Sequence, residues 1–183
     1  MVIYDNALMN KPVSVEQRHY MTPGGHSRLR DELEFLVKTE RPKIVEIVSW
    51  AASNGDRSEN GDYLYGKKRL REIDRRIRFL MKRLENAHVI DPGLQQHKDQ
   101  VFFGATVVVC DEDGTEATYS IVGVDEADPN KGWISWVSPL ARALIKLREG
   151  DVARFVSPLG ERELEVVEVV YQSLDMPGFD PEA

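Results

Sequence analysis

The chain has 183 residues, of which 42% are hydrophobic and 30% are charged, and its formal net charge is −7. This composition is typical of a charge-rich globular protein with one domain or two small ones. The acidic balance argues against a protein that binds nucleic acid over its whole surface, and the single cysteine excludes an internal disulfide.

Residues 1–20 show no sustained periodicity, and we interpret them as an N-terminal extension. They lack the basic start and apolar run of a secretory signal peptide. No stretch of the chain approaches the ~18 continuous apolar residues of a membrane span. We therefore expect a cytoplasmic protein that has no membrane contact.

Residues 21–91 are predicted to form a helical hairpin. Thr22 is a candidate N-cap with Pro23 at the first helical position, although two glycines leave the start of the first helix open by a few residues. Apolar periodicity then continues to about residue 53. Pro42 lacks a backbone donor, so a kink or local offset is expected near residues 40–42.

The second helix has an unbroken heptad pattern, with apolar or small residues alternating at steps of three and four. Its seam consists of Tyr63, Gly66, Leu70, Ile73, Ile77, Leu80 and Leu84. Because the connecting loop is short, the two helices must run antiparallel as a coiled coil. Gly66 would allow the helix backbones to approach closely near the tip.

A basic strip is predicted on the outward face of this second helix. Residues 67–83 carry nine Lys or Arg against two acids, a local charge of +7. The strip comprises Lys68, Arg71, Arg75, Arg78 and Lys82, flanked by Arg69, Arg76 and Arg83. One interpretation is a solvated face with ion pairs to glutamates of the first helix. Because stacked like charges repel, contact with RNA or another phosphate is the alternative that we favour.

The loop between the helices, residues 55–63, forms an acidic tip. Three carboxylates, Asp56, Glu59 and Asp62, lie within seven residues of one another. Carboxylate oxygens are preferred ligands of Mg²⁺, which usually takes only one or two of them from a protein. Alternatively, Asp56 could be the N-cap of the second helix, with Glu59 as its capping-box partner.

From residue 101 onwards the apolar period changes to two, which predicts a compact α+β domain over residues 101–172 after a linker at 92–100. Strands are expected at about 105–110, 117–124, 133–137, 151–156 and 162–171. Ser138-Pro139 is expected to cap a short helix, and the apolar pattern of the last strand suggests a bulge or burial on both faces. Residues 173–183 are expected to be a loose tail.

Residues 55–63, with the following Lys67-Lys68-Arg69-Leu70-Arg71-Glu72-Ile73-Asp74-Arg75-Arg76, resemble the bacterial Gre transcript-cleavage factors, those of the GreB type in particular. The similarity extends through residues 50–53, 101–105 and 138–144, and covers about residues 21–172. Gly61 stands where an alanine is expected in a GreB-type tip. The resemblance implies an antiparallel coiled-coil hairpin followed by an FKBP-like domain. It also implies an accessory factor, not a complete enzyme.

By this resemblance, the coiled coil enters the secondary channel of bacterial RNA polymerase and stimulates cleavage of backtracked RNA. Asp56 and Glu59 match the tip acids, which would hold Mg²⁺ jointly with the polymerase or activate water. The basic strip, including Arg69 and Arg76, would bind the nascent 3′ RNA. Ser58, Asn60, Asp62 and Tyr63 could support the tip, although Tyr63 also fits the seam. Candidate polymerase-docking residues are Asp125, Glu126, Asp128, Ser138, Pro139 and Arg142.

Two other functions stay open at this point. A regulator of the same shape could occupy the channel without inducing cleavage, and it would need no tip acids. A prolyl-isomerase-like chaperone would leave the one-sided basic strip unexplained. The four histidines are too dispersed for a zinc motif, and no P-loop is present. We expect a monomer that binds polymerase and RNA.

Overall fold

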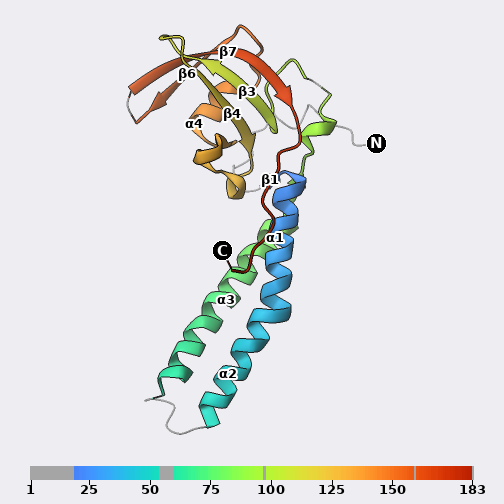
Figure 1. The fold of residues 1–183 in the computed structure, drawn as a ribbon, viewed down its shortest axis with the longest axis vertical. Helices are drawn as coiled ribbons and strands as arrows, with labels where there is room; N and C mark the ends of the chain where they lie inside the picture. Colours follow the sequence, from blue (N-terminus) through green and yellow to red (C-terminus); the bar gives the residue numbers. More distant parts are fainter. Residues whose placement is uncertain (1–18, 54–59, 97, 159, 183) are drawn as a thin grey trace.

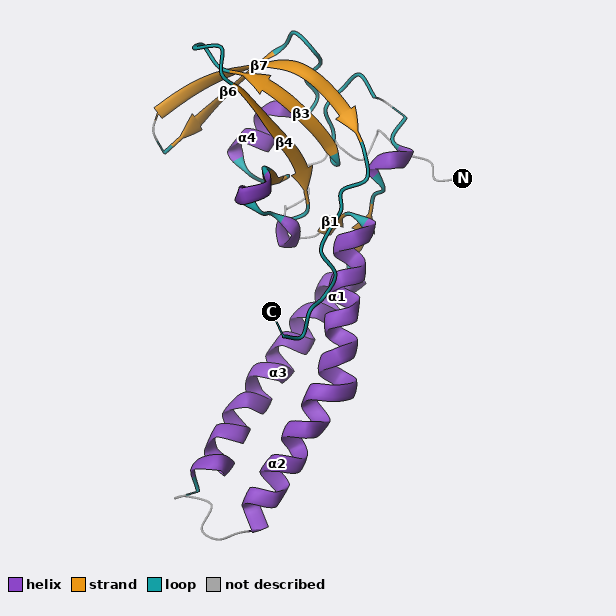
Figure 2. Cartoon of the chain, viewed as in Figure 1, coloured by secondary structure: helices purple, strands orange, loops and turns teal. Residues whose placement is uncertain are grey.

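The computed structural model describes residues 19–182 except 54–59, 97 and 159. It consists of a long helical hairpin that projects from a domain built on a curved sheet (Figure 1). Figure 2 shows the long helices of the hairpin below and the sheet above, with the short helix α4 beside the sheet. The predicted α+β class is confirmed.

The first arm of the hairpin contains three consecutive helical segments. They are α1 (Pro23–Phe35), the π-helical turn η3 (Leu36–Glu40) and α2 (Arg41–Ser53). Thr22 caps α1 as predicted, because its hydroxyl accepts a hydrogen bond from the Gly25 amide at 3.1 Å.

The π turn accounts for the proline in this arm. Arg41 donates its amide to the carbonyl of Leu36, five residues back, so the turn is one residue wider than an α-turn. Pro42, the next residue, has no amide to donate, and its ring would crowd the carbonyl four residues before it. The expected offset near Pro42 is therefore a widened turn inside a continuous arm.

The second arm is α3 (Gly61–Glu85), which packs antiparallel to the first. Three seam residues, Gly66, Ile73 and Leu80, are buried, and the other seam residues are partly buried. Gly66 allows the predicted close approach, because a Cβ atom at this position would lie 2.4 Å from Cγ2 of Val48 on α2.

A small parallel sheet closes the base of the hairpin. Strand β1 (His19–Met21) pairs with β2 (Ala87–Val89), and His19 lies opposite Ala87. Two residues of the expected N-terminal extension, His19 and Tyr20, therefore belong to the hairpin domain. Strand β2 lies within the range expected for the hairpin, directly after the second helix.

The C-terminal domain has a five-stranded sheet in the order β5-β4-β3-β7-β6. Its strands are β3 (Ala105–Cys110), β4 (Glu116–Val122), β5 (Trp133–Ser135), β6 (Val152–Ser157) and β7 (Gly160–Tyr171). All pairs are antiparallel except β4 with β5. Three short 3₁₀ turns, η4 (Pro92–Leu94), η5 (Val124–Glu126) and η6 (Pro129–Lys131), lie in the connections.

Helix α4 (Pro139–Leu144) buries Ala141 and Leu144 in the core beneath this sheet. The predicted bulge lies in β7, because Val108 of β3 pairs with Glu168 whereas the next residue, Val109, pairs with Val166. Val167 is the extra residue and is exposed. The bulge returns Val169 to the buried face. This explains why the buried residues of β7 have even numbers before the bulge, at Leu164 and Val166, and an odd number after it.

The tail beyond β7 is not loose along its described length. It runs back from the sheet domain along the hairpin, where the chain end is marked in Figure 1. The ring of Phe179 lies 5.5 Å from that of Phe35, centroid to centroid, and Met176 contacts Gly24 closely enough to exclude a side chain there. In the described part of the chain, no helix is both long and apolar enough to cross a membrane.

Candidate functional site

The tip of the hairpin is closed by Asn60. Its side-chain oxygen accepts a hydrogen bond from the Tyr63 amide at 3.2 Å, and its side-chain nitrogen donates to the carbonyl of Ala51 at 2.8 Å. Asn60 therefore caps α3 and ties it to the end of α2. These contacts agree with the predicted supporting role of Asn60 at the tip, and they engage both polar atoms of its side chain.

Three of the predicted tip residues, Asp56, Ser58 and Glu59, lie outside the described residues. Their roles stay predictions. The capping alternative for Asp56 is nevertheless wrong, because Asn60 occupies the N-cap position of α3.

Asp62 and Tyr63, in the first turn of α3, differ in their surroundings. Asp62 is exposed. Tyr63 is partly buried, and Nζ of Lys67 lies 5.3 Å from the centre of its ring. This placement agrees with the seam interpretation of Tyr63.

The five outward residues of the basic strip are all exposed, and within the described chain none of them forms an ion pair. They are Lys68, Arg71, Arg75, Arg78 and Lys82. Their spacings of three and four place them along one face of α3 over about 21 Å. The ion-paired interpretation of this face is therefore wrong for these five side chains, as far as the described residues extend.

The two flanking arginines behave differently. Arg76 donates hydrogen bonds to both carboxylate oxygens of Glu32 on α1, at 2.6 and 2.7 Å, and this interaction with Glu32 raises the pKa of Arg76. Arg69 lies 3.4 Å from Glu40 and 3.6 Å from Glu72. In this structure they connect the two arms of the hairpin, and their assignment to the RNA-binding strip stays a prediction.

The predicted docking loop is partly buried at the junction between the hairpin and the sheet domain. Glu126 is only 3% exposed, so it cannot present its carboxylate to a partner. Its carboxylate accepts hydrogen bonds from the amide and hydroxyl of Thr22 and from the Gly123 amide. Burial raises the pKa of Glu126, and the hydrogen bonds oppose this shift.

Asp125 also holds the junction together. Its carbonyl accepts a hydrogen bond from Arg28 of α1, and its carboxylate lies 3.3 Å from Nε of Arg83 at the end of α3. Thr22, Arg28 and Arg83 were missed as junction residues. Nothing in the sequence indicates these contacts, because the partners of Thr22 and Arg28 lie 104 and 97 positions away, and Arg83 also contacts a different domain.

Of the remaining predicted docking residues, two cap short helical turns and two are exposed. Asp128 accepts from the Asn130 amide at 3.0 Å, and Ser138 accepts from the Ala141 amide at 3.2 Å. Each therefore stabilises a short helical turn. Pro139 and Arg142 are exposed on α4 and stay available to a partner.

Comparison with known proteins places this geometry in a family. Residues 19–89 match the model of the N-terminal domain of transcription elongation factors, and residues 95–171 match that of the GreA/GreB C-terminal domain. The chain belongs to the GreA/GreB family of transcription elongation factors.

Related Gre factors share most of this chain. It is 60% identical to the transcription elongation factor GreB of Neisseria meningitidis strain MC58 over 163 residues, which span 89% of this chain and 100% of that protein. It is 50% identical to GreB of Haemophilus influenzae over 154 residues, 84% of this chain and 97% of that protein.

Among solved structures, the chain is similar to the GreA factor homologue Gfh1 of Thermus thermophilus. The sequence identity is 24% and the TM-score is 0.39, with 83% of this chain and 98% of that chain covered.

The hairpin of this Gre factor carries a basic strip along α3 and an acidic sequence at its tip. The described residues contain no group of three or more His, Cys, Asp or Glu side chains that could hold a metal ion. What the hairpin offers is an exposed cationic face that leads toward an acidic tip sequence. Such a face can bind a phosphate backbone without reading its bases.

Proposed function

We propose that this chain stimulates the intrinsic RNA-cleaving activity of bacterial RNA polymerase in backtracked, arrested elongation complexes. The hairpin would enter the secondary channel and bring Asp56 and Glu59 to the polymerase active site. The observation that carries the proposal is the row of five exposed basic residues along the projecting hairpin, none of which forms an ion pair with another described residue. A helix placed only for stability would mix charges of both signs along such a face.

The dimensions of the hairpin support this role. At about 1.5 Å per residue, α3 is ~37 Å long, more than the diameter of a small domain. Asn60 ties the ends of the two arms together, so the tip sequence is carried on a closed structure. Arm ends that are held together in this way lose less conformational entropy on entering a channel than frayed ends would.

The tip acids suit a Mg²⁺ ion that is shared with the polymerase. The donors available at positions 56 and 59 are carboxylates, which are hard oxygen ligands, and two of them leave most of an octahedral shell to water, phosphate and the partner. When bound, Mg²⁺ supplies charge stabilisation for the oxygens of a phosphodiester displacement. Asp56 and Glu59 would anchor the weakly held ion or accept the proton of the attacking water.

The basic strip would hold the 3′ segment of RNA that backtracking extrudes. Cationic side chains on phosphates give an affinity that falls steeply with salt and carries no base specificity. Lys68 would lie nearest the tip and Lys82 nearest the sheet domain. Exposed Pro139 and Arg142 would contact the polymerase, whereas the buried Glu126 would maintain the orientation of the domain.

The proposal is tested by RNA cleavage in a stalled, backtracked bacterial elongation complex. We expect the native protein to accelerate cleavage, and an Asp56→Ala, Glu59→Ala variant to bind the polymerase but not accelerate cleavage. The matched control is Glu112→Ala, Asp113→Ala, which removes two carboxylates from an exposed turn between β3 and β4. It should behave as the native protein.

Two results would count against the proposal. If native protein binds the polymerase without accelerating cleavage, the chain is a channel-occupying regulator. If the tip variant still accelerates cleavage, the acids of the tip do not supply the chemistry.

A further inference from the structure

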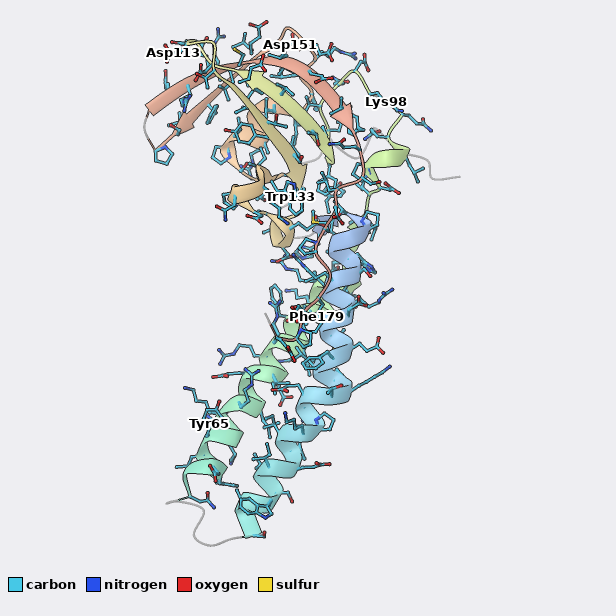
Figure 3. The ribbon with its side chains drawn as sticks, in the orientation of Figure 1. Tyr65, Lys98, Asp113, Trp133, Asp151 and Phe179 are labelled. Atoms are coloured by element: carbon cyan, nitrogen blue, oxygen red, sulfur yellow. The ribbon has the colours of Figure 1, made fainter. Side chains whose placement is uncertain are left out.

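The basic strip continues toward the tip as two exposed apolar side chains, Leu64 and Tyr65. Leu64 is 52% exposed and Tyr65 is 71% exposed. Leu64 lies four residues before Lys68, which continues the alternating three and four spacing of the strip. Tyr65 lies three residues before Lys68, on the adjoining part of the same surface. Figure 3 shows Tyr65 near the tip end of α3.

Tyr65 has no structural role within the described residues. No hydrogen bond and no ring contact holds its side chain there, and most of its surface is open to solvent. Tyr63, two residues earlier, contrasts with it, because Tyr63 is partly buried in the seam and has Lys67 beside its ring. Stability of the hairpin therefore explains Tyr63 but not Tyr65.

The position of Tyr65 indicates what it contacts. A single exposed apolar residue requires no explanation, but Leu64 continues the line of the five exposed cations, which form no ion pair with the described residues, and Tyr65 lies beside that line. Surfaces that bind single-stranded nucleic acid combine cations along the phosphates with aromatic rings on which bases stack. A ring at the tip end of a cationic row fits a strand whose phosphates follow that row.

We propose that Tyr65 is a base-stacking residue for the single-stranded RNA whose phosphates lie on the basic strip, with Leu64 as its apolar neighbour. This inference rests on the proposed function, because it requires RNA on the strip. Stacking is tolerant of sequence, since every base has a π-face. Tyr65 therefore positions the strand near the tip without selecting a sequence.

Binding of a fluorescent single-stranded RNA to the intact protein at low salt tests the proposal. Tyr65→Ala should weaken binding by about five-fold or more, whereas Tyr65→Phe, which keeps the ring, should bind as the native protein does. With an abasic oligonucleotide of the same length, which has phosphates but no bases, native protein and Tyr65→Ala should bind equally. Thermal unfolding verifies that Tyr65→Ala is folded.

Trp50→Ala is the matched control. Trp50 is also a highly exposed aromatic residue, at 64%, and lies near the tip, but on α2, which does not carry the strip. It should bind both oligonucleotides as the native protein does. An equal loss for Trp50→Ala, or an unchanged affinity of Tyr65→Ala for base-containing RNA, would overturn the stacking role.

An Arg71→Ala, Arg75→Ala variant separates this inference from the proposed function. If that variant binds both oligonucleotides more weakly while Tyr65→Ala does not, stacking is wrong and the strip is retained. If no variant changes binding, or native protein binds neither oligonucleotide, RNA contact by the strip is wrong as well. Binding of each variant to polymerase is measured in parallel. If Tyr65→Ala binds polymerase more weakly but binds RNA as the native protein does, Tyr65 contacts a protein surface and the stacking role is wrong.

Discussion

Glu126 is the residue that joins the two parts of the molecule, although its sequence context suggested an exposed docking loop. Its carboxylate accepts hydrogen bonds from Thr22 at the start of α1 and from Gly123 in its own domain. Gly25 and Gly123 leave room for it, because a Cβ atom at either position would clash with its carboxylate. A buried carboxylate of this kind must be fully hydrogen-bonded to be tolerated.

The raised pKa of Glu126 gives a pH dependence with a definite sign. Burial lifts the pKa above its usual value of 4.5. The stability contributed by the neutral acid is therefore fully present below that value and is lost as pH rises through the folded-state pKa. A Glu126→Gln side chain does not titrate, so native protein should lose stability relative to this variant between pH 4 and pH 7.

Urea unfolding of both proteins at pH 4 and pH 7 measures this effect. The quantity compared is the difference in the free energy of unfolding, native minus variant, and we expect it to be smaller at pH 7. A larger difference at pH 7 would mean that the hydrogen bonds to the carboxylate outweigh the effect of burial.

Residue roles were predictable where they depend on neighbours in the sequence. Thr22 and Ser138 cap their helices as predicted, because a cap is a contact between residues three apart. Glu126 was misassigned because its partner Thr22 lies 104 positions away. The N-cap of α3 is Asn60, whereas the sequence offered Asp56 only as an alternative cap, since several polar residues of the tip satisfy the same local pattern.

Among the helices and strands, α3 was the element most fully predicted from the sequence. Its heptad seam and its outward basic strip were both predictable, because a helical period assigns each residue to a face without reference to the rest of the chain. The shorter elements were not. Strands β1 and β2 have only three residues each, and the helices of the hairpin separate them along the sequence. No local pattern therefore indicates either strand.

Two glycines of α3 provide a test of the close packing between the arms. Gly66→Ala should destabilise the protein by about 1–3 kcal/mol, because its Cβ would overlap a methyl group of Val48, whose branched side chain has little freedom to rotate. Gly61→Ala is the matched control. Nothing lies within 4 Å of the added Cβ, so it should stabilise the protein by roughly 0.5–1 kcal/mol.

Chemical unfolding of the two variants beside native protein measures these shifts. Shifts of opposite sign are the expected result. If Gly66→Ala stabilises the protein as much as Gly61→Ala does, the arms are not closely packed at this position.

For the whole molecule, the important property is the distribution of charge over an extended shape. The chain is acidic overall, with a net charge of −7, yet its projecting hairpin carries an exposed basic face. The acidic remainder reduces adhesion to nucleic acid in general, so contact is confined to the hairpin. The junction at Glu126 and the tail along the hairpin both connect the sheet domain to this element.

The FKBP-like domain illustrates the limit of sequence reasoning at this scale. Its strands and its bulge were predicted from the alternation of apolar residues along the sequence. The resemblance to a known family was needed to name the fold. The tail was expected to be loose because it is rich in prolines and acids. Its contacts through Met176 and Phe179 depend on a surface of α1 that exists only after the hairpin has formed.

The most direct test of the proposed function is to locate the tip of the hairpin in a backtracked elongation complex. A photoreactive group attached at Gly61→Cys, in a Cys110→Ser background so that it is the only thiol, reports the neighbours of the first residue of α3. We expect cross-links to the 3′-terminal nucleotides of the RNA and to the polymerase active centre. Cross-links confined to the outer surface of the polymerase, in a complex that still cleaves its RNA faster, would contradict the proposed function.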